Sequence, residues 1–263
     1  CAFASHGDTK HICLYPADPR EAFEFAVAAF DLAERFQTPV FVLTDLDIGM
    51  NDWMVPKLTW DDDYYPNRGK VLSAEELESI AAFYRYTDVD GDGIPYRTLP
   101  GVHPKGAYFT RGSGHNAKGG YTEDADEYQE VMDRIARKID EARYAVPVSY
   151  VRRAPGAKDG ILSIGGCHAA CMEATDLLAP AGHPIDYLRV RGFPFGKEVG
   201  EFIESHENVY VVEQNRDAQL RSLLILDLGA CGLKLKPVLN YSGFPMNAQT
   251  VVNGVLRAED RSA

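Results

Sequence analysis

Residues 88–93, DVDGDG, place three aspartates at alternating positions ahead of a glycine, which is how a calcium-binding loop begins. Such a loop also needs a bidentate glutamate at its twelfth position. Leu99 stands there instead, so the loop lacks its most strongly charged ligand. The stretch is interpreted as a solvent-exposed Asp/Gly turn, with weak calcium binding as the alternative.

Cys167, His168 and Cys171 form a second group with metal-ligand chemistry. Two thiolates and one imidazole leave a tetrahedral zinc site one ligand short. The chain also has no CxxC motif of the kind that holds an iron–sulfur cluster. The sequence therefore predicts small residues at a strand-to-helix turn, and no metal ligands in this chain.

Cations gather in two neighbouring stretches of an otherwise acidic chain. Arg97, His103 and Arg111 lie in GIPYRTLPGVHPKGAYFTRG, and His115 lies in the glycine-rich RGSGHNAKGGY. The second stretch is no P-loop, because Lys118 is not followed by Ser or Thr. These cations either face a carboxylate or phosphate ligand or pair with nearby acidic residues, and both interpretations stay open. No nucleophile–base arrangement such as GxSxG is present.

The elements that would position these residues begin with a strand–helix–strand unit. HICLYP at 11–16 and TPVFVLTD at 38–45 are short apolar runs that predict buried strands with parallel pairing. Between them, Asp18 can cap a helix that has Pro19 at its first position, and Glu21 completes a capping box. The buried face of this helix is predicted to consist of Phe23, Ala26, Val27, Phe30 and Ala33.

A polar connector and a second α/β region follow. Residues 47 to about 120 are rich in Asp, Gly, Pro and Tyr, and 122–143 has strong helical periodicity. After Pro155 four strand–helix pairs predict a largely parallel sheet. Pro237 marks the last strand as an edge strand because proline cannot donate to a ladder. The predicted strands cover 159–166, 184–193, 208–215 and 233–243.

Composition excludes several classes of function. The chain has 263 residues, 45% of them hydrophobic, and a net charge of −12, which disfavours nucleic-acid binding. No apolar run approaches the roughly 20 residues that cross a bilayer, so no membrane partner is expected. Five cysteines without an export signal predict reduced thiols in a cytoplasm. Because the chain opens at Cys1 rather than methionine, we expect a piece of a longer polypeptide.

Four blocks of the sequence resemble the α subunit of 2-oxoacid:ferredoxin oxidoreductases, and most closely the 2-oxoglutarate type. The blocks are HGDTKHICLYPADPREAFEFAVAAFDLAERFQTPVFVLTD, DGIPYRTLPGVHPKGAYFTRGSGHN, GGYTEDADEY and VYVVEQNRDAQL. The resemblance implies an α/β fold in three parts: residues 1–50 as the end of the pyrimidine-side thiamine-diphosphate domain, 51–157 as a connector, and 158–257 as a domain like the C-terminal domain of transketolase.

The resemblance also implies an activity that this chain does not perform alone. The family converts a 2-oxoacid and coenzyme A to acyl-CoA and CO2 and passes electrons to ferredoxin. Thiamine diphosphate with Mg lies between the α and β subunits, and a 4Fe-4S cluster lies in the β subunit, in an (αβ)2 hetero-oligomer. The family's activating glutamate, YPITP-like segment and substrate arginine have no counterpart in this sequence, so no catalytic residue is assigned.

Residues near substrate or cofactor are proposed by position in the resembling blocks. They are His6 and Asp8 at the edge of the first domain, and Arg97, His103, Arg111 and His115 in the connector. The sequence leaves two further hypotheses open: a non-catalytic α/β module for assembly or partner docking, and a calcium-binding surface protein. It does not decide which 2-oxoacid is used.

Overall fold

The computed structural model describes residues 1–5, 8–112 and 114–260, with side chains described up to residue 258. The chain divides into two compact units. Unit 1 consists of residues 1–12, 28–40 and 62–145. Unit 2 consists of residues 13–27, 41–61 and 146–263. The domain limits implied by the family resemblance remain a prediction.

The predicted strand–helix–strand order is confirmed. β1 (Ile12–Leu14), α1 (Pro19–Phe36) and β2 (Val40–Val42) follow one another, and β2 is the neighbour of β1 in a three-stranded sheet. The third strand is β6 (Gly192–Phe193), which pairs with β1 antiparallel. The single strand expected at 184–193 is therefore interrupted, and its last residues join the other sheet.

Helix α1 begins as the capping pattern predicts but buries a different face. Asp18 Oδ1 accepts the Glu21 backbone N–H at 2.8 Å. Phe25, Leu32 and Phe36 are buried, whereas Phe30 is 75% exposed. The predicted face was wrong because apolar residues surround most of this helix, so the periodicity fits more than one direction.

A five-stranded, mostly parallel sheet forms the centre of unit 2, as predicted. Its order is β3-β5-β4-β7-β8, and the β4–β5, β4–β7 and β7–β8 pairs are parallel. The edge strand β8 contains Pro237, as expected. The antiparallel strand at the other edge was not predicted. The strands are β3 (Tyr150–Arg152), β4 (Asp159–Ser163), β5 (Ile185–Arg189), β7 (Val209–Glu213) and β8 (Leu235–Leu239).

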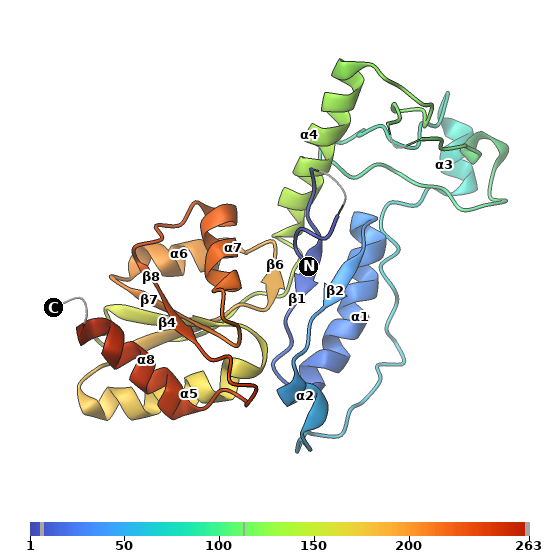
Figure 1. Ribbon diagram of the computed structural model, residues 1–263. Helices are drawn as coiled ribbons and strands as arrows, with labels where there is room; N and C mark the ends of the chain where they lie inside the picture. Colours follow the sequence, from blue (N-terminus) through green and yellow to red (C-terminus); the bar gives the residue numbers. More distant parts are fainter. Residues whose placement is uncertain (6–7, 113, 261–263) are drawn as a thin grey trace. The chain divides into compact units, whose positions relative to one another are not determined.

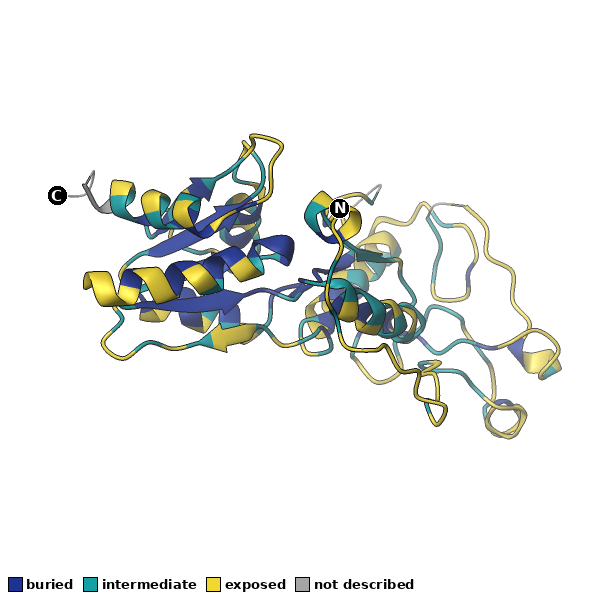
Figure 2. Ribbon diagram, turned by 90° about the horizontal axis from the view of Figure 1, so that it is seen from below, coloured by how far each residue is buried: buried dark blue, intermediate teal, exposed yellow. Residues whose placement is uncertain are grey.

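Helices cover both faces of this sheet. Helices α5 and α8 pack together on one face, and α6 and α7 lie on the other (Figure 1). The bounds are α5 (His168–Leu178), α6 (Lys197–Ser205), α7 (Gln219–Leu228) and α8 (Ala248–Asp260). The central strands β5 and β7 are buried along their whole length, and β4 is buried from its second residue on, because both faces are covered (Figure 2). The chain is thus an α/β protein of the predicted class.

Unit 1 depends on one long helix and on loops. Helix α4 (Ala125–Ala142) confirms the helix predicted at 122–143, and Asp124 caps it by accepting two backbone N–H groups. Unit 1 also contains residues 28–36 of α1, the short helix α3 (Ala74–Ser79) and a 3-10 turn, Pro104–Gly106. Much of the chain between residues 62 and 122 is exposed loop (Figure 2).

No helix within the described residues is both long enough and apolar enough to cross a membrane. The short helix α2 (Leu46–Met50) belongs to unit 2 and begins at Asp45, whose side chain accepts the Ile48 N–H.

Candidate functional site

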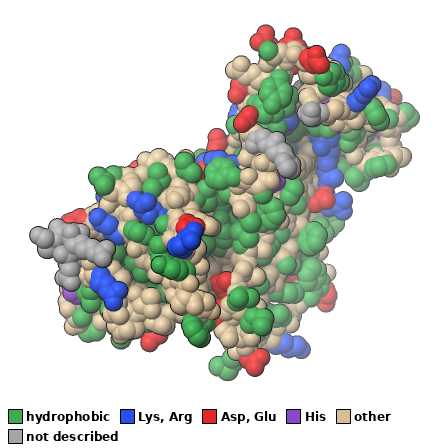
Figure 3. Space-filling model, viewed as in Figure 1, with side chains coloured by type: hydrophobic (Ala, Val, Ile, Leu, Met, Phe, Trp, Pro, Cys, Tyr) green, Lys and Arg blue, Asp and Glu red, His purple; other side chains and the backbone are tan. Residues whose placement is uncertain are grey.

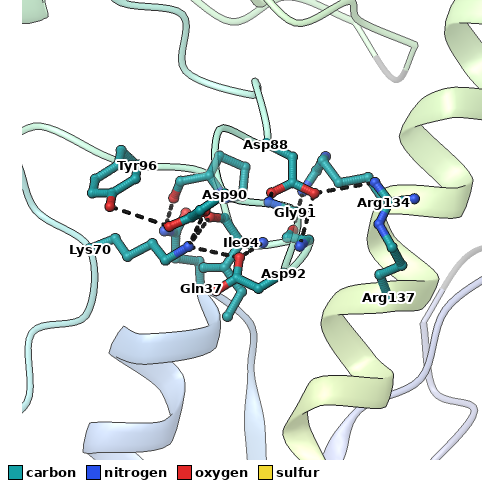
Figure 4. Close-up of polar contacts among 12 residues, drawn as sticks. Gln37, Lys70, Asp88, Asp90, Gly91, Asp92, Ile94, Tyr96, Arg134 and Arg137 are labelled. Carbon is teal, nitrogen blue, oxygen red and sulfur yellow. Dashed lines mark hydrogen bonds and ion pairs between the residues drawn. The ribbon is translucent and has the colours of Figure 1, made fainter.

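The DVDGDG turn brings its three carboxylates together, and two of them bond to a lysine of the same unit. The ligand oxygens of Asp88, Asp90 and Asp92 lie within 4.8 Å of one another. Lys70 Nζ lies 2.6 Å from Asp90 Oδ1, 2.7 Å from Asp92 Oδ1 and 3.0 Å from the Ile94 carbonyl oxygen (Figure 4). Burial lowers the pKa of Lys70, but the hydrogen bonds to the two aspartates outweigh it and leave the pKa above its ordinary value. The lysine thus supplies the positive charge that a metal ion would bring.

Asp88 faces helix α4 instead of Lys70. It accepts the backbone N–H groups of Gly91 and Gly93 at 2.9 and 3.0 Å and pairs with Arg137 at 3.2 Å (Figure 4). Gly93 has a φ of +80°, and a Cβ there would lie 2.4 Å from the Lys138 backbone nitrogen. These contacts favour the interpretation of residues 88–93 as a turn packed against α4.

Arg97 is held by the residues around it. Its guanidinium forms a short ion pair with Glu34 and donates to the Arg68 carbonyl oxygen at 2.9 Å. Its backbone N–H donates to the Lys70 carbonyl oxygen. Both of these bonds are made by Nη2, and the buried Nε has no partner among the described residues.

The other predicted connector residues have separate surroundings. His103 caps the 3-10 turn by accepting the Lys105 N–H, and its Nε2 lies 2.9 Å from Glu78. His115 stacks on Tyr86 with ring centroids 3.9 Å apart, and its buried Nδ1 has no partner among the described residues. Arg111 is exposed.

The remaining predicted residues lie at the start of the chain. Asp8 is exposed at a pocket of about 440 Å³ that includes Ala136 and Ile139 of α4. His6 lies outside the described residues. Within the described ranges, no hydrogen bond joins any two of the predicted site residues, so their shared role in ligand binding stays a prediction.

In unit 2 a side chain of the chain itself lies at the carboxyl ends of the sheet strands, where a ligand of such a sheet would bind. Ligands of open parallel sheets bind beyond the carboxyl ends of the strands where the strand order reverses, which here is between β4 and β7. Asp45 Oδ2 lies there and accepts Gly166 N–H at 2.9 Å and Gln214 Nε2 at 3.3 Å. A Cβ at Gly166 would lie 2.5 Å from that oxygen. Sequence reasoning missed Asp45 because its partners lie more than a hundred residues away.

A pocket of about 540 Å³ opens beside Asp45. Two carboxylates, amide side chains and apolar side chains line it, and among the described residues no lysine or arginine does. The exposed apolar members include Leu46, Met50, Tyr241 and Phe244. Figure 3 shows hydrophobic side chains at the surface around α2.

Glu21 is committed to a buried ion pair in unit 2. Arg189 donates to both of its carboxylate oxygens, at 2.6 and 2.8 Å, and Arg191 Nε donates at 2.8 Å. The Ala17 backbone N–H donates at 2.8 Å. Burial raises the pKa of Glu21, but these hydrogen bonds and charges outweigh it, so the pKa lies below its ordinary value. The predicted capping box is thus confirmed only in part: Asp18 accepts the Glu21 N–H, but the Glu21 carboxylate accepts the N–H of Ala17.

The cysteines of the CHxxC group lie inside unit 2 at the turn that follows β4, where small residues were predicted. Burial raises the pKa of Cys171 to about 12 and that of Cys167 well above its ordinary value. Burial, helped by the charge of Arg189, lowers the pKa of His168 to about 4. His168 Nδ1 lies 3.0 Å from the Tyr187 hydroxyl. The two thiols are therefore protonated at neutral pH.

Comparison with known proteins places these features in a family context. Residues 2–75 match the family model "Pyruvate flavodoxin/ferredoxin oxidoreductase, thiamine diP-bdg". Subunit alpha of 2-oxoacid:ferredoxin oxidoreductase 2 from Aeropyrum pernix is 29% identical, over 97% of this chain and 39% of the relative. The 2-oxoglutarate synthase subunit KorA from Methanothermobacter thermautotrophicus is 25% identical, over 97% of this chain and 65% of the relative.

A solved structure shares the fold. The chain aligns with 2-oxoglutarate:ferredoxin oxidoreductase from Magnetococcus marinus at a TM-score of 0.84 and 21% identity, over 96% of this chain and 43% of that chain. The chain thus spans well under half the length of the Aeropyrum relative and of this structural neighbour. The predicted resemblance is confirmed: this chain is related to part of the α subunit of 2-oxoacid:ferredoxin oxidoreductases.

Proposed function

We propose that the chain is part of the α subunit of a thiamine-diphosphate-dependent 2-oxoacid:ferredoxin oxidoreductase. The enzyme would convert a 2-oxoacid and coenzyme A to acyl-CoA and CO2 and pass two electrons to ferredoxin. The observation that carries this proposal is similarity of both sequence and fold along nearly the whole chain. The names of the KorA relative and of the Magnetococcus structure support 2-oxoglutarate as the 2-oxoacid.

The described residues do not form a thiamine diphosphate site by themselves. Glu21, the buried carboxylate of the family-matched segment, is already paired with Arg189 and Arg191. The Asp88, Asp90 and Asp92 group, which resembles a cation site, is neutralised by Lys70 and Arg137. We therefore propose that thiamine diphosphate, its Mg ion and a 4Fe-4S cluster are held mainly by a β subunit and by α-subunit residues outside this chain. When bound, thiamine diphosphate stabilises the carbanion formed on decarboxylation.

A surface segment of unit 2 supports the proposal that the chain works inside a larger assembly, (αβ)2 in our proposal. Five large apolar residues within 15 positions of sequence are exposed, and Met54 is fully so. Contiguous exposed apolar surface of this kind is typical of protein interfaces. The residues are Leu46, Met50, Met54, Leu58 and Trp60.

Affinity purification of the native complex that contains this chain tests the proposal. The expected result is a co-purifying β-type subunit, with bound thiamine diphosphate and about four iron atoms per αβ pair, as one 4Fe-4S cluster requires. A complex without iron and without thiamine diphosphate would contradict the proposal. It would favour the alternative of a non-catalytic module for assembly or docking.

A further inference from the structure

Three cationic side chains of unit 1 lie near one another, and two of them have buried donors without an acceptor among the described residues. Arg134 and Lys138 lie one turn apart on α4, and Arg85 approaches from the preceding loop. Arg134 is only 8% exposed, and its Nε has no partner among the described residues. Two buried atoms of Arg85, Nε and Nη1, likewise have no partner among the described residues. Buried donors without acceptors are costly, so their recurrence at one place indicates a missing partner.

The described residues balance the charges of the cluster only in part. Burial, together with the charges of Arg134 and Arg85, lowers the pKa of Lys138 to about 8. Among the described residues Asp88 is the carboxylate that attracts Arg134, and Asp88 is already bonded to Arg137 and two backbone amides. None of the undescribed residues of unit 1 is acidic, since they are His6, Gly7 and Ser113.

Neighbouring residues fix the positions of the Arg85 and Arg134 guanidinium groups. Arg85 Nη2 donates to Gln37 Oε1 at 2.5 Å, and its guanidinium lies 5.0 Å from the Tyr86 ring. Arg134 Nη1 donates to the Gly93 carbonyl oxygen at 3.0 Å. These contacts hold both guanidinium groups in place, and with them the donors that have no acceptor. The aromatic ring attracts charge but supplies no oxygen acceptor for them.

The acidic residues that precede Arg134 on α4 line a pocket whose lining includes neither Arg85 nor Lys138. Glu127, Glu130 and Asp133 line a pocket of about 370 Å³ together with Arg134 and Arg137. Glu127 and Glu130 precede Arg134 on α4, whereas Lys138 follows it. Eight residues separate Glu130 from Lys138, a rise of about 12 Å along the helix. Glu127 and Glu130 therefore do not compensate the charge of Lys138.

We propose that Arg85, Arg134 and Lys138 form a binding site for a small oxyanion, either a phosphate group or a carboxylate. Such a ligand offers two or more oxygen acceptors, which match the free guanidinium donors and the ammonium group. The site goes beyond the proposed oxidoreductase function, because it needs neither thiamine diphosphate nor turnover.

Competitive acylation of lysines in the native complex tests the site. Acetic anhydride labels unprotonated amines, and peptide mass spectrometry reports each lysine separately. Inorganic phosphate or 2-oxoglutarate is added at constant ionic strength, with chloride as the reference. We expect at least one of the two anions to slow labelling of Lys138 about tenfold at saturation, because a bound anion both raises the amine pKa and covers it. Labelling of the exposed Lys197 serves as the control and stays unchanged.

Two variants make the test specific. Arg85→Met removes two of the free donors, and protection of Lys138 should then require about ten times more of the anion. Arg137 lies on the same helix but pairs with Asp88, so Arg137→Met should leave the protection of Lys138 unchanged. Protection by phosphate alone or by 2-oxoglutarate alone identifies the ligand class. Equal Lys138 labelling in chloride, phosphate and 2-oxoglutarate overturns the proposal, as does protection that survives Arg85→Met in a complex that still labels normally elsewhere.

Discussion

At the residue scale, Glu21 takes a role that its local sequence only partly predicts. Its backbone N–H completes the helix cap on Asp18, as expected. Its carboxylate bonds to Ala17, Arg189 and Arg191 instead of closing a local capping box. The arginines lie 168 and 170 residues further along the chain, so no local pattern could have revealed them.

We predict that Glu21→Gln lowers the free energy of unfolding by about 3–5 kcal/mol at pH 7, because it leaves Arg189 buried with its charge unpaired. The folded-state pKa of Glu21 is lower than its unfolded value. The stabilisation is therefore present above the unfolded pKa, about 4.5, and is lost as pH falls through the folded pKa. Urea unfolding of both proteins at pH 7 and pH 3 measures this.

A matched control is available on the same helix. Glu24 forms an exposed pair with Arg20, so Glu24→Gln should cost at most about 0.5 kcal/mol. A Glu21→Gln effect no larger than that of Glu24→Gln, or one that does not shrink on acidification, would show that the ion pair contributes little.

Lys70 leads to a second prediction at this scale. Because its ammonium group bonds to Asp90 and Asp92, we expect no calcium binding to this chain at 1 mM or below, where loops with a complete ligand set bind. Isothermal titration calorimetry with calcium chloride should give only heats of dilution. A saturable heat that Lys70→Met does not strengthen would indicate a metal site despite the lysine.

At the scale of elements, substitution of two glycines in the DVDGDG turn compares the cost of backbone strain alone with the cost of strain plus a steric overlap. Gly91 and Gly93 both have positive φ, +83° and +80°, but only Gly93 contacts the backbone of α4. We predict that Gly91→Ala costs about 1–2 kcal/mol, the cost of the left-handed conformation alone. Gly93→Ala should cost about 1–3 kcal/mol more, because its Cβ would overlap α4. Thermal unfolding of both variants measures the difference, and equal costs would mean that the turn does not pack on α4.

The elements that the sequence predicted are those with strong periodicity or clear boundaries. Helix α4 and the strands β4, β5 and β7 were found because apolar spacing and flanking glycines mark them. The strand β3 was missed, and β6 was predicted only as the end of one strand at 184–193, because two or three residues carry no periodicity and their pairing depends on distant partners. The buried face of α1 was wrong because its apolar residues surround most of the helix.

At the scale of the whole molecule, the family was predictable and the details of the site were not. Blocks of sequence carried the resemblance, and fold comparison agrees with it. The groups that the structure brings together come from distant positions: Asp45 with Gly166, Glu21 with Arg189, and Arg85 with Lys138. Such pairs are set by tertiary packing, which a single sequence does not display. The proposed roles of Arg97 and His103 in ligand binding likewise await a test on the assembled enzyme.

The central claim is tested most directly by ferredoxin reduction in the purified native complex that contains this chain. Absorbance of oxidised ferredoxin is followed after addition of 2-oxoglutarate and coenzyme A, with each omitted in turn and with pyruvate as the comparison substrate. We predict reduction that requires coenzyme A and is faster with 2-oxoglutarate than with pyruvate. A complex that carries its cofactors and yet reduces no ferredoxin with any 2-oxoacid would contradict the account.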